Sequence, residues 1–212
     1  MNTHRKLIRR TALVATGGVA ALVLAACGGN GGSGQAMGSV ESTTSAPATG
    51  APAEAGDHNA ADVSFAKEMI QHHRQAVEMA DLAPTRASSA ETEELAATIK
   101  GAQDPEITTM SGWLTSWGEE VPADMSGMGH DMANGMPGMM SKEDMDKLMK
   151  AKGAEFDKMF AEMMIKHHEG AIEMAEKEKA EGKYGPAFKL ADDVIKAQTA
   201  EIEQMNKMLG KS

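Results

Sequence analysis

One segment of this chain occurs twice, and the duplication limits the folds that the chain can adopt. Residues 62–80 return as residues 157–175, at an offset of 95 positions and without a gap. Matches at the same offset continue downstream, between residues 95–114 and residues 190–209. A repeat of this length indicates that one structural unit was duplicated, so we expect a fold that pairs two equivalent units.

In each copy, residues that could line the core recur at the spacing of a helix. In the first copy, steps of four, three, four and three residues separate Phe65, Met69, His72, Ala76 and Met79. The same steps in the second copy separate Phe160, Met164, His167, Ala171 and Met174. This spacing places each set along one face of a helix, as in helices that pack in bundles. Either Asp57 or Asn59 is expected to cap the first helix.

The rest of the folded part also favours helix. Aromatic residues make up only 3% of the chain, and no run of β-branched residues suggests a strand. We expect a partner helix over about residues 89–117, kinked at Pro105, and another over about residues 186–209. A further helix is expected to start at Ser141, and Gly153 either ends it or lies within a longer helix. Two helical hairpins predict an all-α fold, an antiparallel four-helix bundle.

The first residues have the layout of an export signal. A basic start is followed by an apolar run over residues 12–26, which leads into the tetrapeptide Leu-Ala-Ala-Cys. This tetrapeptide resembles the bacterial lipobox. Residues 1–26 are therefore predicted to be a lipoprotein signal peptide, and Cys27 the lipidated residue that anchors the protein to the outer face of the cell membrane. The alternative is an uncleaved anchor, although the run is shorter than the roughly 20 residues that a span needs.

Composition divides the remainder of the chain. Residues 27–57 are rich in Gly, Ser, Ala and Pro, and are predicted to be a flexible, disordered tether. Residues 58–210 are predicted to form one helical domain. Its parts are repeat one over residues 58–118, a Met-rich loop over residues 122–140, and repeat two over residues 141–210.

The charge and the single cysteine restrict the partners. The formal net charge is −10, and residues 1–26 carry four basic and no acidic residues, so the rest of the chain carries −10 − 4 = −14. This charge disfavours nucleic acid and favours cations as partners. Cys27 is the only cysteine, so no internal disulfide can form. If this exported protein binds a soft metal, the ligands must therefore be Met and His, because no thiolate is available. The sequence does not identify a protein partner.

The repeated histidine pairs are the first candidate metal ligands. One histidine of each pair falls on the apolar helix face, the other lies beside it, and a methionine stands three or four residues earlier. These candidate ligands are His72, His73, Met69, His167, His168 and Met164.

Polar residues on the expected partner helices are candidates to orient these imidazoles. Gln103 and Glu106 share one stripe with apolar residues, and Gln198 and Glu201 repeat them. Buried polar groups need partners, and metal-bound imidazoles are usually oriented by a second hydrogen bond. The alternative is that the histidines on the apolar face are core residues, hydrogen-bonded to Glu106 and Glu201, with no role in metal binding.

The Met-rich loop is the second candidate ligand set. Its Gly, Pro, Ser and Asn content predicts no regular structure, and we expect it to lie outside the core. Thioethers and imidazoles are neutral donors that select Cu(I), with Ag(I) close behind. The alternative is a loop that folds back over the bundle as an apolar cover. The candidate ligands are Met125, Met128, His130, Met132, Met136, Met139 and Met140.

Enzyme classes are less well supported. Di-iron carboxylate bundles use Glu-x-x-His, but Met or Ile stands three residues before each paired histidine. No nucleophile signature or phosphate-binding Gly-rich loop is visible either. We therefore expect no catalytic residues, and an oxidase that uses copper or iron is the least favoured class.

The repeat resembles the signature of the family called domain of unknown function 305. The resemblance lies in residues 58–63, Phe65-Ala66, Met69-Ile70, His72-His73 and residues 76–80, and in their second copies, and it covers roughly residues 58–209. It implies a ferritin-like four-helix bundle in exported bacterial proteins, some of which are linked to periplasmic copper binding. Our leading prediction is a lipid-anchored extracytoplasmic protein that sequesters or transfers Cu(I). The main alternative is a structural or partner-binding lipoprotein.

Overall fold

A computed structural model describes residues 56–124 and 135–211. The predicted signal peptide, Cys27 and nearly all of the predicted tether lie outside these residues. Four of the candidate ligands of the Met-rich loop also lie outside them, namely Met125, Met128, His130 and Met132.

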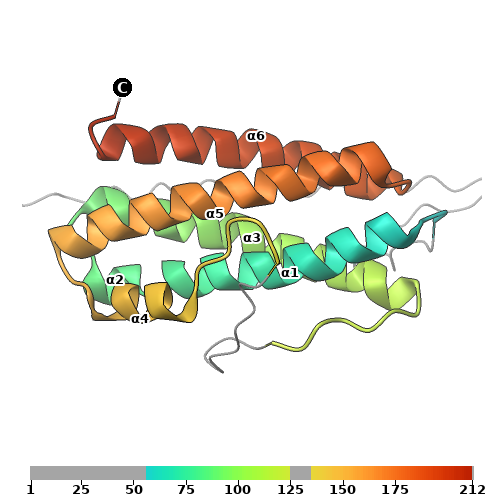
Figure 1. The fold of residues 1–212 in the computed structure, drawn as a ribbon, viewed down its shortest axis with the longest axis horizontal. Coiled ribbons are helices and arrows are strands. Elements are labelled where there is room, and N and C mark those ends of the chain that lie inside the picture. Colours follow the sequence, from blue (N-terminus) through green and yellow to red (C-terminus); the bar gives the residue numbers. More distant parts are fainter. Residues whose placement is uncertain (1–55, 125–134, 212) are drawn as a thin grey trace, which may run out of the picture. The chain divides into compact units, whose positions relative to one another are not determined.

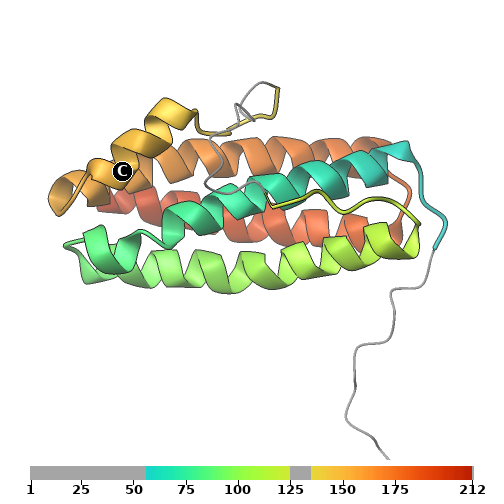
Figure 2. The ribbon, with the colours of Figure 1, turned by 90° about the horizontal axis from the view of Figure 1, so that it is seen from below.

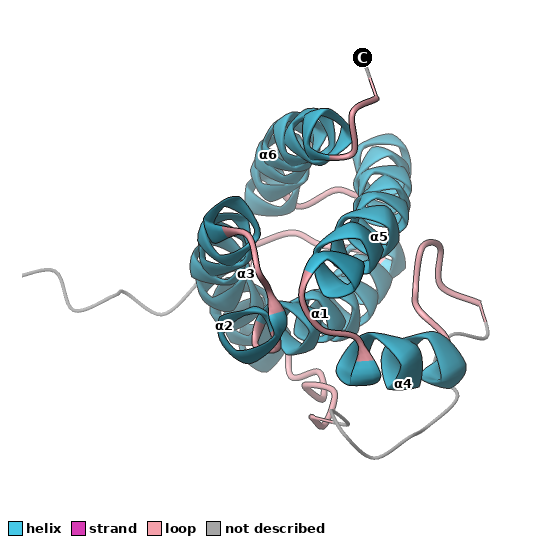
Figure 3. Ribbon diagram, turned by 90° about the vertical axis from the view of Figure 1, so that its left-hand side faces the viewer, coloured by secondary structure: helices cyan, strands magenta, loops and turns pink. Residues whose placement is uncertain are grey.

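Four long helices form the bundle that the repeat predicts (Figure 1). Each repeat supplies one helical hairpin, and the first long helices of the two hairpins run antiparallel and side by side at the centre. Figure 3 shows the same four helices from one end. The long helices are α1 (Ala60–Ala80), α3 (Ala90–Ser116), α5 (Ala154–Glu181) and α6 (Gly185–Met208). The described residues contain no strand, so the predicted all-α bundle is confirmed.

Two short helices lie outside the repeat pattern. The sequence predicts α4 (Lys142–Lys150), whose N-cap Ser141 accepts a hydrogen bond from the Asp144 amide, and α4 packs against α5 (Figure 2). Gly153 ends the connection from α4 with a φ of +64°, a conformation that favours glycine, so α4 and α5 are separate helices. We did not predict α2 (Ala83–Arg86), a single turn with Pro84 at its start.

Local hydrogen bonds explain where the first hairpin begins. Of the two candidate caps, Asn59 is the one used: its side-chain oxygen accepts from the amides of Ala61 and Asp62. Asp62 in turn accepts from the Asn59 amide at 2.6 Å, which completes a capping box. The helix α3 runs through Pro105 as one element of 27 residues, so the proline at which we expect a kink does not end the helix.

The core consists of two apolar clusters, one toward each end of the bundle. One cluster joins the C-terminal half of α1 to the N-terminal half of α5 around Met79, Phe160 and Met164. The other joins the opposite halves around Phe65, Met69 and Met174. Side chains of α3 and α6 enter both clusters, so all four helices share the core. The paired histidines belong to neither cluster; on α1 and α5 they lie between the residues that build the two clusters.

Within the two stretches that the structure describes, no helix combines the length and the apolar character that a membrane span requires.

Candidate metal centre

His72 and His167 meet at the centre of the bundle. They lie at equivalent positions of α1 and α5, and their ring centroids are 3.8 Å apart with the rings tilted by 39°. Both side chains are fully buried. The duplication produces this contact, because two equivalent helix faces packed antiparallel bring equivalent residues together. We refer to His72 and His167 as the central pair.

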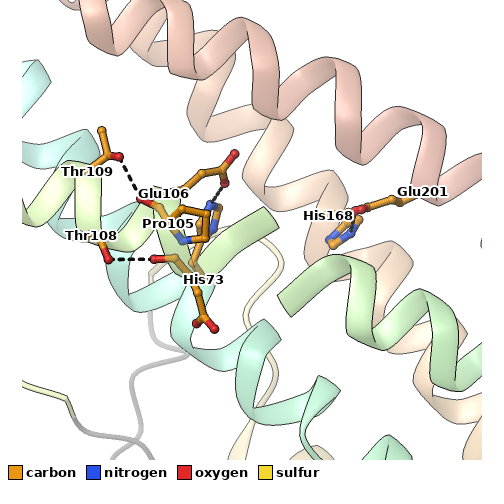
Figure 4. Close-up of polar contacts among 8 residues, drawn as sticks. His73, Pro105, Glu106, Thr108, Thr109, His168 and Glu201 are labelled. Atoms are coloured by element: carbon orange, nitrogen blue, oxygen red, sulfur yellow. Dashed lines mark hydrogen bonds and ion pairs between the residues drawn. The ribbon is translucent and has the colours of Figure 1, made fainter. Parts of the chain in front are cut away.

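The other two histidines point toward the partner helices. His73 donates from Nε2 to Glu106 Oε2 of α3 at 2.6 Å, and His168 donates from Nε2 to Glu201 Oε2 of α6 at 2.7 Å (Figure 4). The alternative interpretation assigned these glutamates to the histidines of the apolar face, and that pairing is wrong. A single helical step of about 100° separates neighbouring side chains, so the adjacent histidine is the one that reaches the partner helix.

These hydrogen bonds determine where the protons sit. Carboxylate and carbonyl oxygens only accept, so His73 and His168 carry a proton on Nε2. His72 donates from Nε2 to the carbonyl oxygen of Pro137 at 3.0 Å. In a neutral ring the lone pair then lies on Nδ1. All four Nδ1 atoms, and also Nε2 of His167, are buried without a hydrogen-bond partner among the described residues.

Burial keeps the central pair neutral. Desolvation, followed by the neighbouring His73, lowers the pKa of His72 from 6.5 to about 3. Desolvation, followed by His72, lowers the pKa of His167 well below 6.5. Both rings are therefore uncharged at neutral pH, which is the form that ligates metal ions.

The predicted orienting residues divide into two groups. Glu106 and Glu201 contact the imidazoles, as expected. Gln103 and Gln198 are buried, but the Oε1 atom of each has no hydrogen-bond partner in the described part of the chain. An unpaired buried carboxamide oxygen is costly, so each is a further polar group in the interior that is open to a ligand or a water.

The predicted methionine ligands are placed differently from one another. Met69 and Met164 are fully buried, but they belong to the two separate apolar clusters. Met136 is half-buried, whereas Met139 and Met140 are buried and Met140 is part of the core. Our expectation that the Met-rich loop lies outside the core is therefore wrong for Met139 and Met140. These side chains are buried because removing apolar surface from water, both their own and that of α1 and α5, is favourable.

No ready-made site of hard or thiolate ligands exists in the described residues. No three side chains of the types His, Cys, Asp and Glu converge on one point that suits a metal ion. The arrangement instead offers two neutral imidazoles in contact, with two further imidazoles beside them. This donor set suits a soft ion of low coordination number, and it does not suit ions that require many oxygen ligands.

A buried carboxyl pair was missed by the sequence analysis. Asp62 is fully buried and accepts hydrogen bonds from the amides of Asn59, Lys183 and Tyr184, so it ties the start of α1 to the turn before α6. Glu178 is buried against it, and desolvation, followed by contact with Asp62, raises the Glu178 pKa to about 8. Asp62 stands three residues before Phe65, and Glu178 four residues after Met174, so both continue the helix faces that carry predicted ligands, and this spacing was a signal that they are buried.

Solved structures of known proteins have a similar fold. Two solved structures of the DUF305 family resemble the chain: a Streptomyces coelicolor protein described as secreted, with 31% identity and a TM-score of 0.64, and a Deinococcus radiodurans fragment, with 26% identity and a TM-score of 0.65. The first match covers 71% of this chain and 92% of the other, and the second covers 73% and 99%. No curated protein matches the chain.

Solved structures of CopM are also similar. CopM in its Cu(II)-bound form is 36% identical with a TM-score of 0.60, and the match covers 69% of this chain and 94% of CopM. Cu(I)-bound and Ag-bound forms of CopM match as well. The sequence pattern of DUF305, a domain of unknown function, matches residues 62–209 of this chain. The chain thus belongs to the DUF305 family.

Proposed function

We propose that this protein binds a soft metal ion, Cu(I) in the first place, and sequesters or transfers it outside the cytoplasm. The observation that carries the proposal is the central pair, two neutral imidazoles in contact at the centre of the bundle with their Nδ1 atoms unpartnered among the described residues. An unsatisfied buried polar atom is costly, and a ligand offers a reason to retain it.

The donor chemistry supports copper over other ions. Imidazole and thioether are neutral and polarizable, and the proposed ligands include no carboxylate or thiolate, which zinc sites often contain. In the proposal the central pair binds the ion, and Glu106 and Glu201 orient His73 and His168 as further ligands. The methionines of the loop are additional soft donors. The likeness to CopM, which has been solved with Cu(I), Cu(II) and Ag, adds support.

The buried position of the central pair implies that the protein rearranges when it binds an ion. Met69 and Met164 belong to the apolar clusters at either end of the bundle. Either thioether, or the second histidine of each pair, must turn toward the ion to complete its coordination. The absence of a catalytic role remains a prediction from the sequence.

Elemental analysis of the protein purified from copper-fed cells tests the proposal. We expect copper in a defined ratio to protein, retained through gel filtration. The same protein from zinc-fed cells is the control, and it should retain no zinc. Protein that carries neither metal, or that carries both equally, would contradict the proposal.

The structural alternative keeps one observation in its favour. The bonds from His73 to Glu106 and from His168 to Glu201 satisfy half of the imidazoles without any metal. If all four histidines were only core residues, replacing them would lower stability and leave copper binding unchanged. The two readings therefore differ in one measurable quantity, the copper bound by variants of the central pair.

The anchoring part of the proposal rests on the sequence. A lipobox-like tetrapeptide ends at Cys27, and one DUF305 relative is described as secreted. We propose that the protein is exported and held at the outer face of the cell membrane by a lipid on Cys27. Metabolic labelling with a fatty acid tests this: Cys27→Ala should abolish the label, and unchanged labelling would remove the anchor from the account.

A further inference from the structure

Residues 136–140, which we call the strap, lie across the central pair. In Figure 1 the strap is part of the gold loop that leads into α4. Its Pro137 carbonyl oxygen accepts the hydrogen bond of His72 from α1, and Gly138 lies against the backbone of α5. The strap thus contacts both helices at the level where His72 and His167 meet.

Two glycines let the strap touch the backbone of α5. A Cβ atom at Gly170 would lie 2.2 Å from the Pro137 carbonyl oxygen, and one at Gly138 would lie 2.6 Å from the Lys166 carbonyl oxygen. Side chains do not tolerate such distances. Gly138 also has a φ of +74°, which favours glycine. Any side chain at position 170 must therefore push the strap away.

One glutamine holds the strap on α1. Gln75 accepts from the Met140 amide at 2.7 Å and donates to the Met140 carbonyl oxygen at 3.0 Å. This bidentate contact and the bond from His72 are the polar attachments of the strap to α1. Among the described residues, no backbone–backbone hydrogen bond holds residues 136–140. The strap therefore has fewer restraints than the helices that form the other walls around the central pair.

The repeat changes at the position that meets the strap. At the offset of 95 residues, Gln75 corresponds to Gly170, although the His-His pair before it and the alanine after it are the same in both copies. Gln75 of the first copy hydrogen-bonds the strap, whereas Gly170 of the second copy has no side chain and lets the strap lie against α5. Both residues therefore hold the same segment in place.

We propose that Gln75 and Gly170 are positioning residues for the central pair. By seating the strap they keep the Pro137 carbonyl on His72 Nε2, which leaves the His72 lone pair at Nδ1, and they control the entry of a soft metal ion. This inference rests on the proposed function. Because both imidazoles are fully buried, an ion reaches them only when a surrounding segment moves away. The strap is the surrounding segment that is held by side-chain hydrogen bonds rather than by a helix backbone.

The test is the rate of Ag(I) uptake by the purified protein, measured by stopped flow against a chelator. Gln75→Ala removes two hydrogen bonds and Gly170→Ala displaces the strap, so uptake should become at least about tenfold faster in each. Gln75→Glu keeps the acceptor for the Met140 amide, and its rate should be intermediate. Gln71→Ala is the matched control, since Gln71 lies one turn earlier and donates to Ala123 rather than to the strap. Its rate should stay at the wild-type value.

A second readout does not depend on metal. In ¹⁵N spectra of the metal-free protein, His72 should show a proton on Nε2, and this preference should weaken in Gln75→Ala and Gly170→Ala while helix content stays unchanged. Wild-type uptake rates together with a wild-type His72 tautomer in both variants would overturn the proposal. If the wild-type protein binds no Ag(I) or Cu(I), the proposed function fails, and the tautomer alone then decides whether the strap positions His72.

Discussion

Acid should destabilise the metal-free bundle through the central pair. The folded pKa of His72 is about 3 and that of His167 is well below 6.5, whereas both titrate near 6.5 in the unfolded chain. Below pH 6.5 the unfolded state therefore binds a proton at each histidine that the folded state does not bind. The stability that these groups contribute is complete above pH 6.5 and is lost as the pH falls toward their folded pKa values.

The magnitude follows from the two pKa values. At pH 5 the 1.5-unit distance below 6.5 corresponds to about 2 kcal/mol for His72, and the lowered pKa of His167 acts in the same direction. Glu178 acts in the opposite direction, since its pKa rises from 4.5 to about 8 and the folded state holds the extra proton between these values. Glu78, whose pKa burial also raises, acts in the same direction as Glu178. The two histidines outweigh the carboxyl groups, so the free energy of unfolding should rise from pH 5 to pH 6, by at most about 1.4 kcal/mol per pH unit.

The assay is urea unfolding followed by circular dichroism at pH 5.0, 5.5 and 6.0 in the presence of a chelator. In the double variant His72→Gln with His167→Gln, the raised pKa values of Glu178 and Glu78 determine the slope, so the free energy of unfolding should fall as the pH rises from 5 to 6. The comparison uses slopes, so a general loss of stability in the variant does not affect it. Equal slopes in the two proteins would refute the reasoning that burial keeps the central pair neutral.

Three further predictions concern other parts of the molecule. Glu178→Gln should make the free energy of unfolding rise more steeply between pH 5 and pH 6, because the opposing proton is lost; an unchanged slope would contradict the raised pKa. Asn59→Ala should cost about 1 kcal/mol in urea unfolding through loss of the cap, whereas the control Asp57→Ala should cost less. Met140→Leu and Met79→Leu should each cost under about 1.5 kcal/mol. In a chelator competition only the former should lower Cu(I) capacity, and equal capacities would remove Met140 as a ligand.

The four long helices and the position of the histidines were predictable because they depend on local periodicity. Steps of three and four residues define a helix face, and the duplication makes the faces of α1 and α5 equivalent. The contact between His72 and His167 follows from that symmetry. The contacts of His73 and His168 with Glu106 and Glu201 also repeat, since each joins residues 33 positions apart.

The strap was not predictable by the same reasoning. Its bonds to His72 and Gln75 join residues 65 positions apart, and its Gly, Pro and Met sequence has no periodicity that would place it. The burial of Met140 depends on this long-range contact. The available signal was weak, because the change from Gln75 to Gly170 is one of eight differences between residues 62–80 and residues 157–175. The structure then shows that this difference lies where only one copy hydrogen-bonds the strap.

The carboxyl pair was missed for another reason. Asp62 and its second copy Asp157 look equivalent in sequence, but Asp157 binds the exposed Ser88, whereas Asp62 is buried beside Glu178. The position that matches Glu178 in the first copy is Ala83. The environment of an aspartate near a helix start depends on the turn that packs against it, and helical spacing does not define that turn.

The most direct test of the central claim is a Cu(I) competition titration of the protein in which His72 and His167 are both replaced by Gln, together with its melting temperature. His58→Gln is the matched control, because His58 stacks on Trp117 outside the central pair. We expect the double variant to lose bound copper that the wild type and the control retain. Full copper binding with a lowered melting temperature would contradict the account and identify the central pair as core residues.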